Sequence, residues 1–195
     1  MLAASLLAIL FTAPGPSAKP VHVVMTTELG ELELAVDVVH APLTARNFLR
    51  YVEAGHYDGG RFHRTVTLKP DNQPNNKVKI EVIQGGVAPA QESKGWPAIG
   101  LERTTKTGLK HLDGTISMAR AEPDSATSDF FVCIGPQPEL DFGGKRNPDG
   151  QGFAAFGQVV KGMDVVRRIQ AAPVDGQTLT PAVRILKASV VKAKP

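Results

Sequence analysis

The chain has 195 residues, of which 42% are hydrophobic and 21% are charged, and its formal net charge is +3. A chain of this length can bury a large core in a single domain, and we expect residues 19–195 to form one. The basic residues are spread along the sequence, which argues against a nucleic-acid-binding face.

Residues 1–18 differ in composition from the rest of the chain. They contain no charged side chain, and an apolar run from Leu2 to Phe11 is followed by small residues. This is the outline of a secretory signal peptide, although no basic residue precedes the apolar run. The run is too short to span a bilayer, so a transmembrane helix is the weaker alternative. We therefore expect cleavage near Ala18, no stable membrane insertion, and a periplasmic or otherwise exported protein.

The next elements are predicted to be a β-hairpin and a helix. Val21–Met25 is apolar, and strict alternation from Gly30 to Val36 is typical of a half-buried antiparallel strand. A helix should follow, because proline suits its first turn, apolar residues recur at helical spacing and a glycine fits its C-terminal cap: Pro42, Ala45, Phe48, Leu49, Val52 and Gly55.

The remaining two thirds of the chain are predicted to be mainly strands. Apolar runs predict strands over 78–84, 115–119, 130–134, 154–160 and 182–191, and helical spacing predicts a second helix over 162–171. Turn-forming residues predict loops over 68–77, 120–129 and 143–152. Two helices covering a closed antiparallel barrel would bury both helical stripes and leave no exposed strand edge.

Four spaced motifs carry a resemblance to a known family. They are Phe62-His63-Arg64, Gln84-Gly85-Gly86, the segment from Gly114 to Gly135 and Phe156-Gly157-Gln158-Val159. In this order the chain resembles the cyclophilin-type peptidyl-prolyl cis-trans isomerases, in particular bacterial exported members, over residues 21–192. The resemblance implies a mainly β fold, a closed eight-stranded antiparallel barrel capped by two α-helices. The strand signals alone do not fix the number of strands.

The resemblance also implies which residues form the site. Arg64 matches the catalytic arginine and Gln84 matches the residue that orients it. From pattern alone, Arg64 would be a surface ion-pair residue and the aromatic side chains would be core. The positions that match substrate-binding residues are Phe131, Met118, Ala119, Arg120, Leu140, Phe62, Asp129 and Phe153. Ala119 and Arg120 are expected to pair with an extended peptide, as an added strand would.

Several positions depart from the family pattern. Glu81 stands where an aromatic residue is expected, Val82 where a methionine is expected, and Asp129 where a glutamine is usual. Glu139 occupies the position of a tryptophan in many members, and Phe153 that of a histidine. We therefore expect a pocket rim altered by the carboxylates of Glu81 and Asp129, with slower or differently selective turnover.

The sequence thus predicts a monomeric peptidyl-prolyl isomerase that acts on proline-containing polypeptide clients during folding of exported proteins, with no cofactor and no metal. A non-enzymatic proline-peptide-binding chaperone or scaffold is the alternative, which the altered rim keeps open. A hydrolase built from Ser125, His63 and Asp141 is disfavoured, because no nucleophile elbow surrounds a serine. The five histidines show no metal-ligand spacing.

Overall fold

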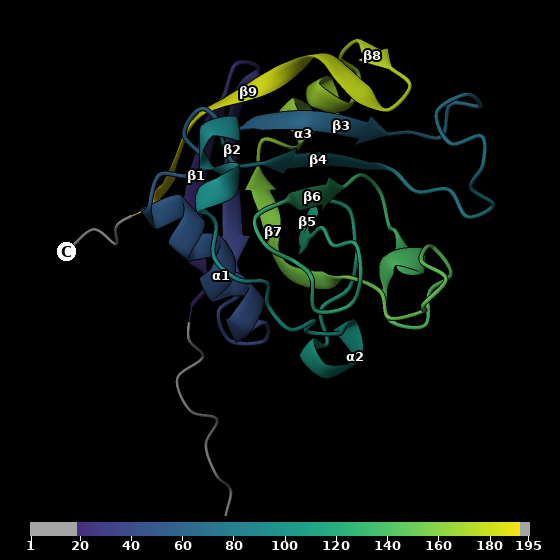
Figure 1. The fold of residues 1–195 in the computed structure, drawn as a ribbon, viewed down its shortest axis with the longest axis horizontal. Coiled ribbons are helices and arrows are strands. Elements are labelled where there is room, and N and C mark those ends of the chain that lie inside the picture. Colours follow the sequence, from purple (N-terminus) through teal and green to yellow (C-terminus); the bar gives the residue numbers. More distant parts are fainter. Residues whose placement is uncertain (1–18, 192–195) are drawn as a thin grey trace, which may run out of the picture.

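The computed structural model describes residues 19–191, so the predicted signal peptide lies outside the described residues. Nine antiparallel strands follow one another in the order β1-β2-β7-β5-β6-β4-β3-β9-β8, and a further pairing of β1 with β9 closes eight of them into a barrel (Figure 1). The strands are β1 Val21–Thr27, β2 Gly30–Val36, β3 Arg61–Val66, β4 Val82–Gly86, β5 Thr115–Met118, β6 Phe130–Cys133, β7 Ala154–Lys161, β8 Val174–Asp175 and β9 Thr178–Val190. The predicted eight-stranded closed antiparallel barrel is confirmed.

Two helices cover the barrel, as predicted. Helix α1, Pro42–Glu53, packs on β9 and β7, and α3, Met163–Gln170, packs on β2, β3 and β4. The last turn of α1 is followed by Gly55 with a φ of +69°, which a side chain with a Cβ adopts only at a cost. Three shorter helical segments are α2 Thr104–Thr107 and the 3-10 turns Pro89–Lys94 and Pro138–Leu140. Within residues 19–191 no helix is long and apolar enough to cross a bilayer.

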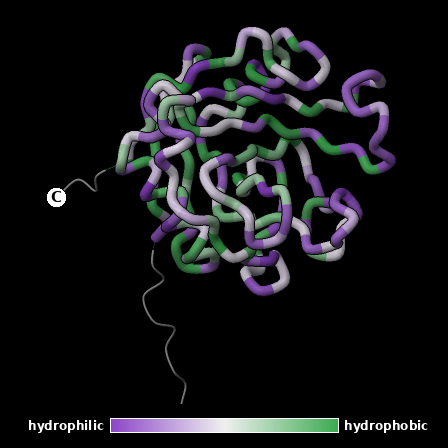
Figure 2. The backbone as a smooth tube through the Cα atoms, viewed as in Figure 1, coloured by the Kyte–Doolittle hydropathy of each residue, from purple (hydrophilic) through white to green (hydrophobic). Residues whose placement is uncertain are grey.

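The barrel interior is filled by one large hydrophobic cluster with aromatic rings at its centre. Phe130 lies 5.5 Å from the rings of both Phe48 and Tyr57 and 5.7 Å from Phe62, and all four side chains are buried completely. The Tyr57 hydroxyl donates to the Ser128 carbonyl oxygen, so its polar end is satisfied inside the core. Figure 2 shows hydrophobic positions along much of the barrel and mainly hydrophilic positions at the tip of the loop that extends to its right.

A second, smaller hydrophobic cluster lies on the outer face of β4 and β6. Its buried members are Val66, Ile80, Val82, Phe131, Cys133 and Leu140. Successive side chains of a strand point to opposite faces, so Phe130 faces the interior while Phe131 faces this outer cluster. Cys133 is buried here as a free thiol, and burial raises its pKa.

The boundaries of β4 differ from the sequence prediction. The strand predicted over 78–84 begins only at Val82 and continues through Gly85 and Gly86, which were expected to end it. Residues 67–81 instead form one long loop, here called the insertion loop, at the right of Figure 1. Buried Gln73 explains the difference: its amide donates to the carbonyls of Thr67 and Ile80 and accepts from the Ile80 N–H. These bonds replace strand pairing for the residues before Val82.

Candidate active site

The candidate site is a row of side chains that crosses four neighbouring strands on the outer face of the barrel. Arg64 on β3 is the register partner of Gln84 on β4, Gln84 that of Phe131 on β6, and Phe131 that of Ser117 on β5. Residues directly opposite one another in an antiparallel pair are the closest side-chain neighbours in a sheet. The sheet register therefore brings the two predicted catalytic residues beside the aromatic ring predicted to receive proline.

A β-bulge in β3 gives Arg64 its direction. Phe62 pairs with Gly85 and Arg64 with Gln84, so His63 is an extra residue with no partner of its own on β4. In a regular strand, residues two apart share a face, and Arg64 would follow Phe62 into the core. The bulge turns the strand locally, so that Phe62 stays buried while the Arg64 side chain reaches the outer cavity.

The Arg64 guanidinium is held on two sides by neutral amides. Its Nη1 donates to Gln84 Oε1 at 3.0 Å, while Nε and Nη2 both donate to Gln177 Oε1, at 2.9 and 2.6 Å. Gln177 in turn donates to the carbonyl oxygen of Asn72 in the insertion loop. Burial lowers the pKa of Arg64, yet a guanidinium stays charged at neutral pH. The result is a fixed cation without a counter-ion among the described residues.

Gln177 was not found from the sequence. It lies in the turn between β8 and β9, 113 residues after Arg64, and no local motif marks it. Only the pairing of β3 with β9 brings this turn to the site. The one available signal was its position between two strand-like runs, which is too general to predict a contact with Arg64.

An acidic residue, Asp129, lies on the side of Gln84 opposite to Arg64. Gln84 Nε2 donates to Asp129 Oδ2 at 3.1 Å, so Gln84 stands between the Arg64 cation and the Asp129 carboxylate. His63 Nε2 lies 3.6 Å from the same carboxylate. A Cβ on Gly86 would overlap Asp129 Oδ1, which explains why a glycine follows Gln84-Gly85 here.

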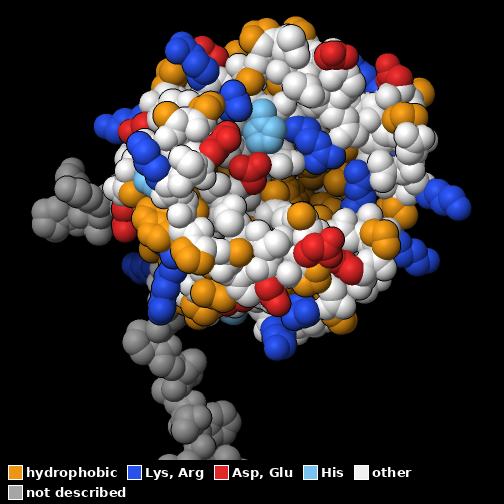
Figure 3. All heavy atoms as spheres, viewed as in Figure 1, with side chains coloured by type: hydrophobic (Ala, Val, Ile, Leu, Met, Phe, Trp, Pro, Cys, Tyr) orange, Lys and Arg blue, Asp and Glu red, His pale blue; other side chains and the backbone are white. Residues whose placement is uncertain are grey.

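A cavity of about 490 Å³, lined by both apolar and polar side chains, opens beside this row. Its lining includes nine residues of the outer cluster, the central row and the loops: Arg64, Ile80, Val82, Gln84, Ala119, Arg120, Phe131, Leu140 and Phe153. Phe153 meets Phe131 edge to face, with the two ring centroids 5.3 Å apart. Figure 3 shows hydrophobic side chains at the bottom of a hollow in this face, with Lys or Arg side chains on its border.

Hydrogen-bonded polar side chains lie directly beneath Phe131, which forms the floor of the cavity. The ring of His111 stacks against Phe131, donates from Nδ1 to the Asp141 carboxylate at Oδ1 (2.8 Å), and contacts Ser117 Oγ through Nε2 (3.0 Å). Burial raises the pKa of Asp141, but the hydrogen bond and the charge of His111 outweigh burial and leave it below its ordinary value. Ser117 and His111 are both fully buried, so this Ser-His-Asp arrangement has no access for a substrate and serves to hold Phe131.

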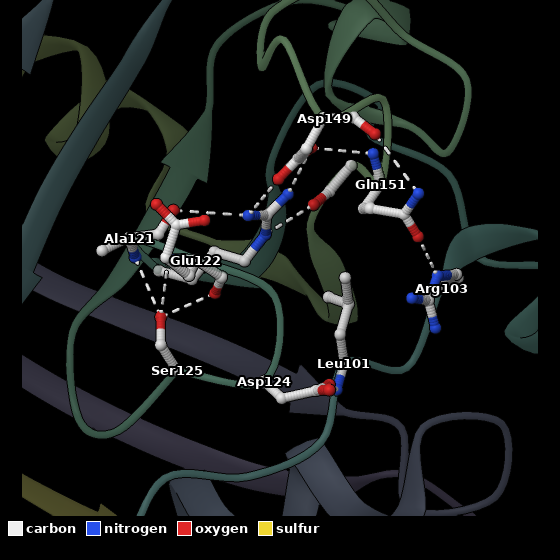
Figure 4. A network of polar contacts seen from close by, with 10 residues as sticks. Leu101, Arg103, Ala121, Glu122, Asp124, Ser125, Asp149 and Gln151 are labelled. Atoms are coloured by element: carbon white, nitrogen blue, oxygen red, sulfur yellow. Dashed lines mark hydrogen bonds and ion pairs between the residues drawn. The ribbon is translucent and has the colours of Figure 1, made fainter.

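Arg120 forms one wall of the cavity and ties two loops together. Figure 4 shows the polar network around it, with Asp149 and Gln151 of the 143–152 loop on one side and Ala121, Glu122 and Ser125 on the other. Arg120 Nη1 and Nη2 donate to the two carboxylate oxygens of Asp149, at 2.8 and 3.1 Å, and its Nε donates to the Gly152 carbonyl oxygen. Its guanidinium also lies over the Phe153 ring, 5.0 Å from the centroid. The bidentate pair and the stacking fix the 143–152 loop against the groove.

The structure brings most of the predicted substrate-binding residues together, but not all of them. Phe131, Ala119, Arg120, Leu140, Asp129 and Phe153 line the cavity with the predicted pair Arg64 and Gln84. Met118 and Phe62 lie outside the lining, because both are fully buried in the barrel interior. The Ala119 N–H already donates to the Asp129 carbonyl oxygen, so it is not available to a peptide in the expected strand-like pairing.

One of the two expected rim carboxylates is absent from the rim. Glu81 does not line the cavity; its carboxylate accepts from Gln170 of α3 instead. The side chains of Ile80 and Val82 line the cavity, and the residue between them points the other way. The expectation of a carboxylate at the rim is wrong for Glu81, and Asp129 alone supplies one. Among residues 19–191 no group of three or more His, Cys, Asp or Glu side chains is placed to hold a metal ion.

Replacing Gln177 with alanine is expected to lower the catalytic efficiency of the site about 5- to 30-fold, because Arg64 loses the acceptor of two of its N–H groups and no longer has one orientation. The readout is the activity that the family resemblance implies, X-Pro isomerisation, measured by NMR exchange. Gln177→Glu should retain more activity than Gln177→Ala, since it keeps an acceptor there. Equal rates for Gln177→Ala and the unmodified chain would show that Arg64 needs no such support.

Acid is expected to release the 143–152 loop from Arg120. The hydrogen bond from Arg120 holds the pKa of Asp149 below its ordinary value. This stabilisation is present above the unfolded-state pKa of the carboxyl, near 4, and is lost as pH falls through the lower folded-state value. Carboxyl ¹³C NMR titration should therefore give Asp149 a lowered pKa in the unmodified chain and a higher one in Arg120→Gln, where only the hydrogen bond from the Gln151 N–H and the charge of Arg103 still lower it. A pKa that does not respond to this change would argue against the clamp.

The comparisons with known proteins agree with this geometry. Residues 22–190 match the family model described as cyclophilin type peptidyl-prolyl cis-trans isomerase/CLD. The chain is 38% identical over 149 residues to peptidyl-prolyl cis-trans isomerase A of Dickeya dadantii, covering 76% of this chain and 70% of that protein. It is 33% identical over 182 residues to peptidyl-prolyl cis-trans isomerase CYP18-2 of Arabidopsis thaliana, covering 90% and 97%.

Solved structures show the same fold. A cyclophilin type peptidyl-prolyl cis-trans isomerase of Cryptosporidium parvum superposes with a TM-score of 0.70 at 20% identity, covering 90% of this chain and 99% of that one. A second structure of that protein, in the presence of the dipeptide Ala-Pro, gives a TM-score of 0.68 at 22% identity, covering 88% and 99%. From the matched family model and these relatives, the chain belongs to the cyclophilin-type peptidyl-prolyl cis-trans isomerases, a family of enzymes.

Proposed function

We propose that this protein accelerates cis-trans isomerisation of X-Pro bonds in polypeptides by non-covalent stabilisation of the twisted amide. The observation that carries the proposal is the Arg64 guanidinium, held by Gln84 and Gln177 beside a cavity floored by Phe131. The reaction breaks no covalent bond; it rotates a resonance-stabilised C–N bond over a barrier of about 18–20 kcal/mol. An apolar pocket for the pyrrolidine ring and a fixed cation are therefore sufficient machinery.

The available donors of Arg64 fit this mechanism. A guanidinium has five N–H groups, and Arg64 directs one from each of Nε, Nη1 and Nη2 to protein acceptors. One N–H on Nη1 and one on Nη2 remain for the substrate. In the twisted amide the nitrogen loses resonance and becomes a hydrogen-bond acceptor, so a donor near it binds the transition state better than the planar ground state. Phe131, Leu140 and Phe153 supply the apolar contact for the ring.

The test is a protease-free assay of the chain from Lys19. Exchange between the cis and trans forms of acetyl-Ala-Ala-Pro-Ala-amide is slow without a catalyst, and NMR exchange spectroscopy measures it directly. We expect accelerated exchange at micromolar protein. Binding of the peptide without accelerated exchange would favour the non-enzymatic alternative, a chaperone or scaffold for proline-containing segments.

We further propose that the clients are exported proteins and that the mature chain is a monomer. The support for export is the composition of residues 1–18, uncharged with a central apolar run. Fusing these residues to a reporter that is active only outside the bacterial cytoplasm tests it: activity with cleavage near Ala18 is expected, and an inactive fusion would contradict it. Light scattering of the chain from Lys19 tests the oligomeric state.

A further inference from the structure

The cavity is lined by a third arginine, beside Arg64 and Arg120, that neither the sequence motifs nor the mechanism above uses. Arg146, from the 143–152 loop, lines the same cavity as Arg64. Its Nη1 donates to Gln73 Oε1 at 2.8 Å and to the Val78 carbonyl oxygen at 2.6 Å. Both acceptors belong to the insertion loop, and Gln73 is completely buried.

The insertion loop thus positions two of the three arginines that line the cavity, Arg64 and Arg146, through two adjacent amide residues. Gln73 accepts from Arg146, while the backbone carbonyl of Asn72 accepts from Gln177, which holds Arg64. The Asn72 side chain is itself fixed, because it accepts from the Thr67 N–H and donates to the Gly176 carbonyl oxygen. A loop this well bonded can hold two like charges near each other, at a cost that a bound anion would offset.

The charge distribution of the cavity is uneven. Arg120 has its counter-ion, Asp149, but neither Arg64 nor Arg146 forms an ion pair among the described residues. Burial and the nearby charge of Arg64 lower the pKa of Arg146, as expected for two cations that lie at the same end of the cavity, next to the insertion loop. Asp129, the one lining carboxylate, is separated from Arg64 by Gln84.

We infer that Arg64 and Arg146 form a carboxylate-binding subsite at the insertion-loop end of the cavity. The protein would then prefer proline-containing peptides with an acidic group beside the proline, either an Asp or Glu side chain or a chain-terminal carboxylate. The inference rests on the proposed function, in that the acidic group belongs to a proline-containing peptide. Arg146 retains Nε and Nη2 for this purpose, since only its Nη1 has a protein acceptor among the described residues.

The test compares matched acidic and neutral peptides. Acetyl-Ala-Asp-Pro-Ala-amide and acetyl-Ala-Ala-Pro-Asp-amide are each set against the Asn counterpart, and acetyl-Ala-Pro as the free acid is set against its amide. We expect kcat/KM to be about five- to tenfold higher for the acidic member of at least one pair, with the preference reduced at high salt. The side-chain and terminal pairs show which source of carboxylate the subsite takes. Equal values in all three pairs would overturn the inference.

Three variants assign the preference to Arg146. Arg146→Gln should reduce the acidic-to-neutral ratio to below about twofold, and Arg146→Lys should retain much of it, because charge rather than the loop contact sets the ratio. Lys145→Gln removes a charge from the adjacent exposed residue, which does not line the cavity, and should leave the ratio at its original value. An unchanged ratio in Arg146→Gln, or an equal loss in Lys145→Gln, would overturn the subsite.

The same peptides separate this inference from the proposed function. If no peptide exchanges faster with the protein, the proposed isomerase activity fails, and dissociation constants from NMR chemical-shift titrations replace kcat/KM. Tighter binding of the acidic members that is lost in Arg146→Gln would still support the subsite. Equal binding of acidic and neutral members would overturn it.

Discussion

Arg64→Ala is expected to lower kcat/KM for X-Pro isomerisation by about 100-fold or more, the usual effect of removing a preorganised donor from a transition-state site. The substitution removes the two N–H groups left for the substrate and the only cation that the central row places beside Phe131. Arg64→Lys should recover part of the rate, because it keeps the charge but loses the fork. NMR exchange measurements on the tetrapeptide would give the three rates.

The fold should survive this substitution, which makes the rate interpretable. Arg64 is only partly buried and its partners are neutral amides, so no charge is left unpaired inside the protein. Arg184→Ala is the matched control. Arg184 lies on the neighbouring strand β9 and pairs with Glu28 on the surface. The isomerisation rate of this variant is expected to stay within about twofold of the unmodified rate. A rate for Arg64→Ala within threefold of the unmodified chain would remove Arg64 from the mechanism.

The local patterns of the sequence predicted most of the fold. The alternation of β2 and the helical spacing of α1 each reflect one face buried against the barrel, so periodicity alone located them. Strand β9 was predicted from residue 182 but begins at Thr178 and runs through Pro181, a residue that weakens any strand pattern. Strand β8 has two exposed residues and carries no periodic signal.

The candidate site was only partly accessible to the same reasoning. Arg64, Gln84 and Phe131 lie in short motifs, and the sheet register then places them side by side. Gln177 and Arg146 act across 113 and 73 residues of sequence, through loops whose conformation is set by tertiary hydrogen bonds. A single sequence shows no local pattern that predicts such long-range contacts, so neither residue was predicted to lie in the site.

The misplacement of Glu81 has a related cause. A motif comparison assigns residues by spacing from Gln84, and it assumes that the strand continues back to residue 78. The bonds of Gln73 end the strand pairing at Val82, and Glu81 then points to Gln170 of α3. The error therefore followed from the insertion loop, whose conformation depends on hydrogen bonds of Gln73 that the local sequence does not reveal.

The second large effect is expected in the barrel core. Phe130→Ala should lower the free energy of unfolding by about 3–5 kcal/mol, the cost of removing a completely buried phenylalanine and leaving a cavity. The ring contacts those of Phe48, Tyr57 and Phe62, so three aromatic pairs are lost together. With typical stabilities of about 5–15 kcal/mol, this is a large part of the total.

The same measurements on a variant of Phe131, the next residue along the strand, test whether this strand presents one face to the core and the other to the candidate site. Phe131 faces the cavity, so Phe131→Leu should cost less stability, about 1–2 kcal/mol, while lowering kcat/KM about tenfold through loss of the flat surface under the proline ring. Urea unfolding followed by the fluorescence of Trp96, the single tryptophan, gives both free energies. Because successive strand residues face opposite sides, stability loss should dominate at Phe130 and activity loss at Phe131. The reverse order would mean that the strand face assigned to the cavity is the wrong one.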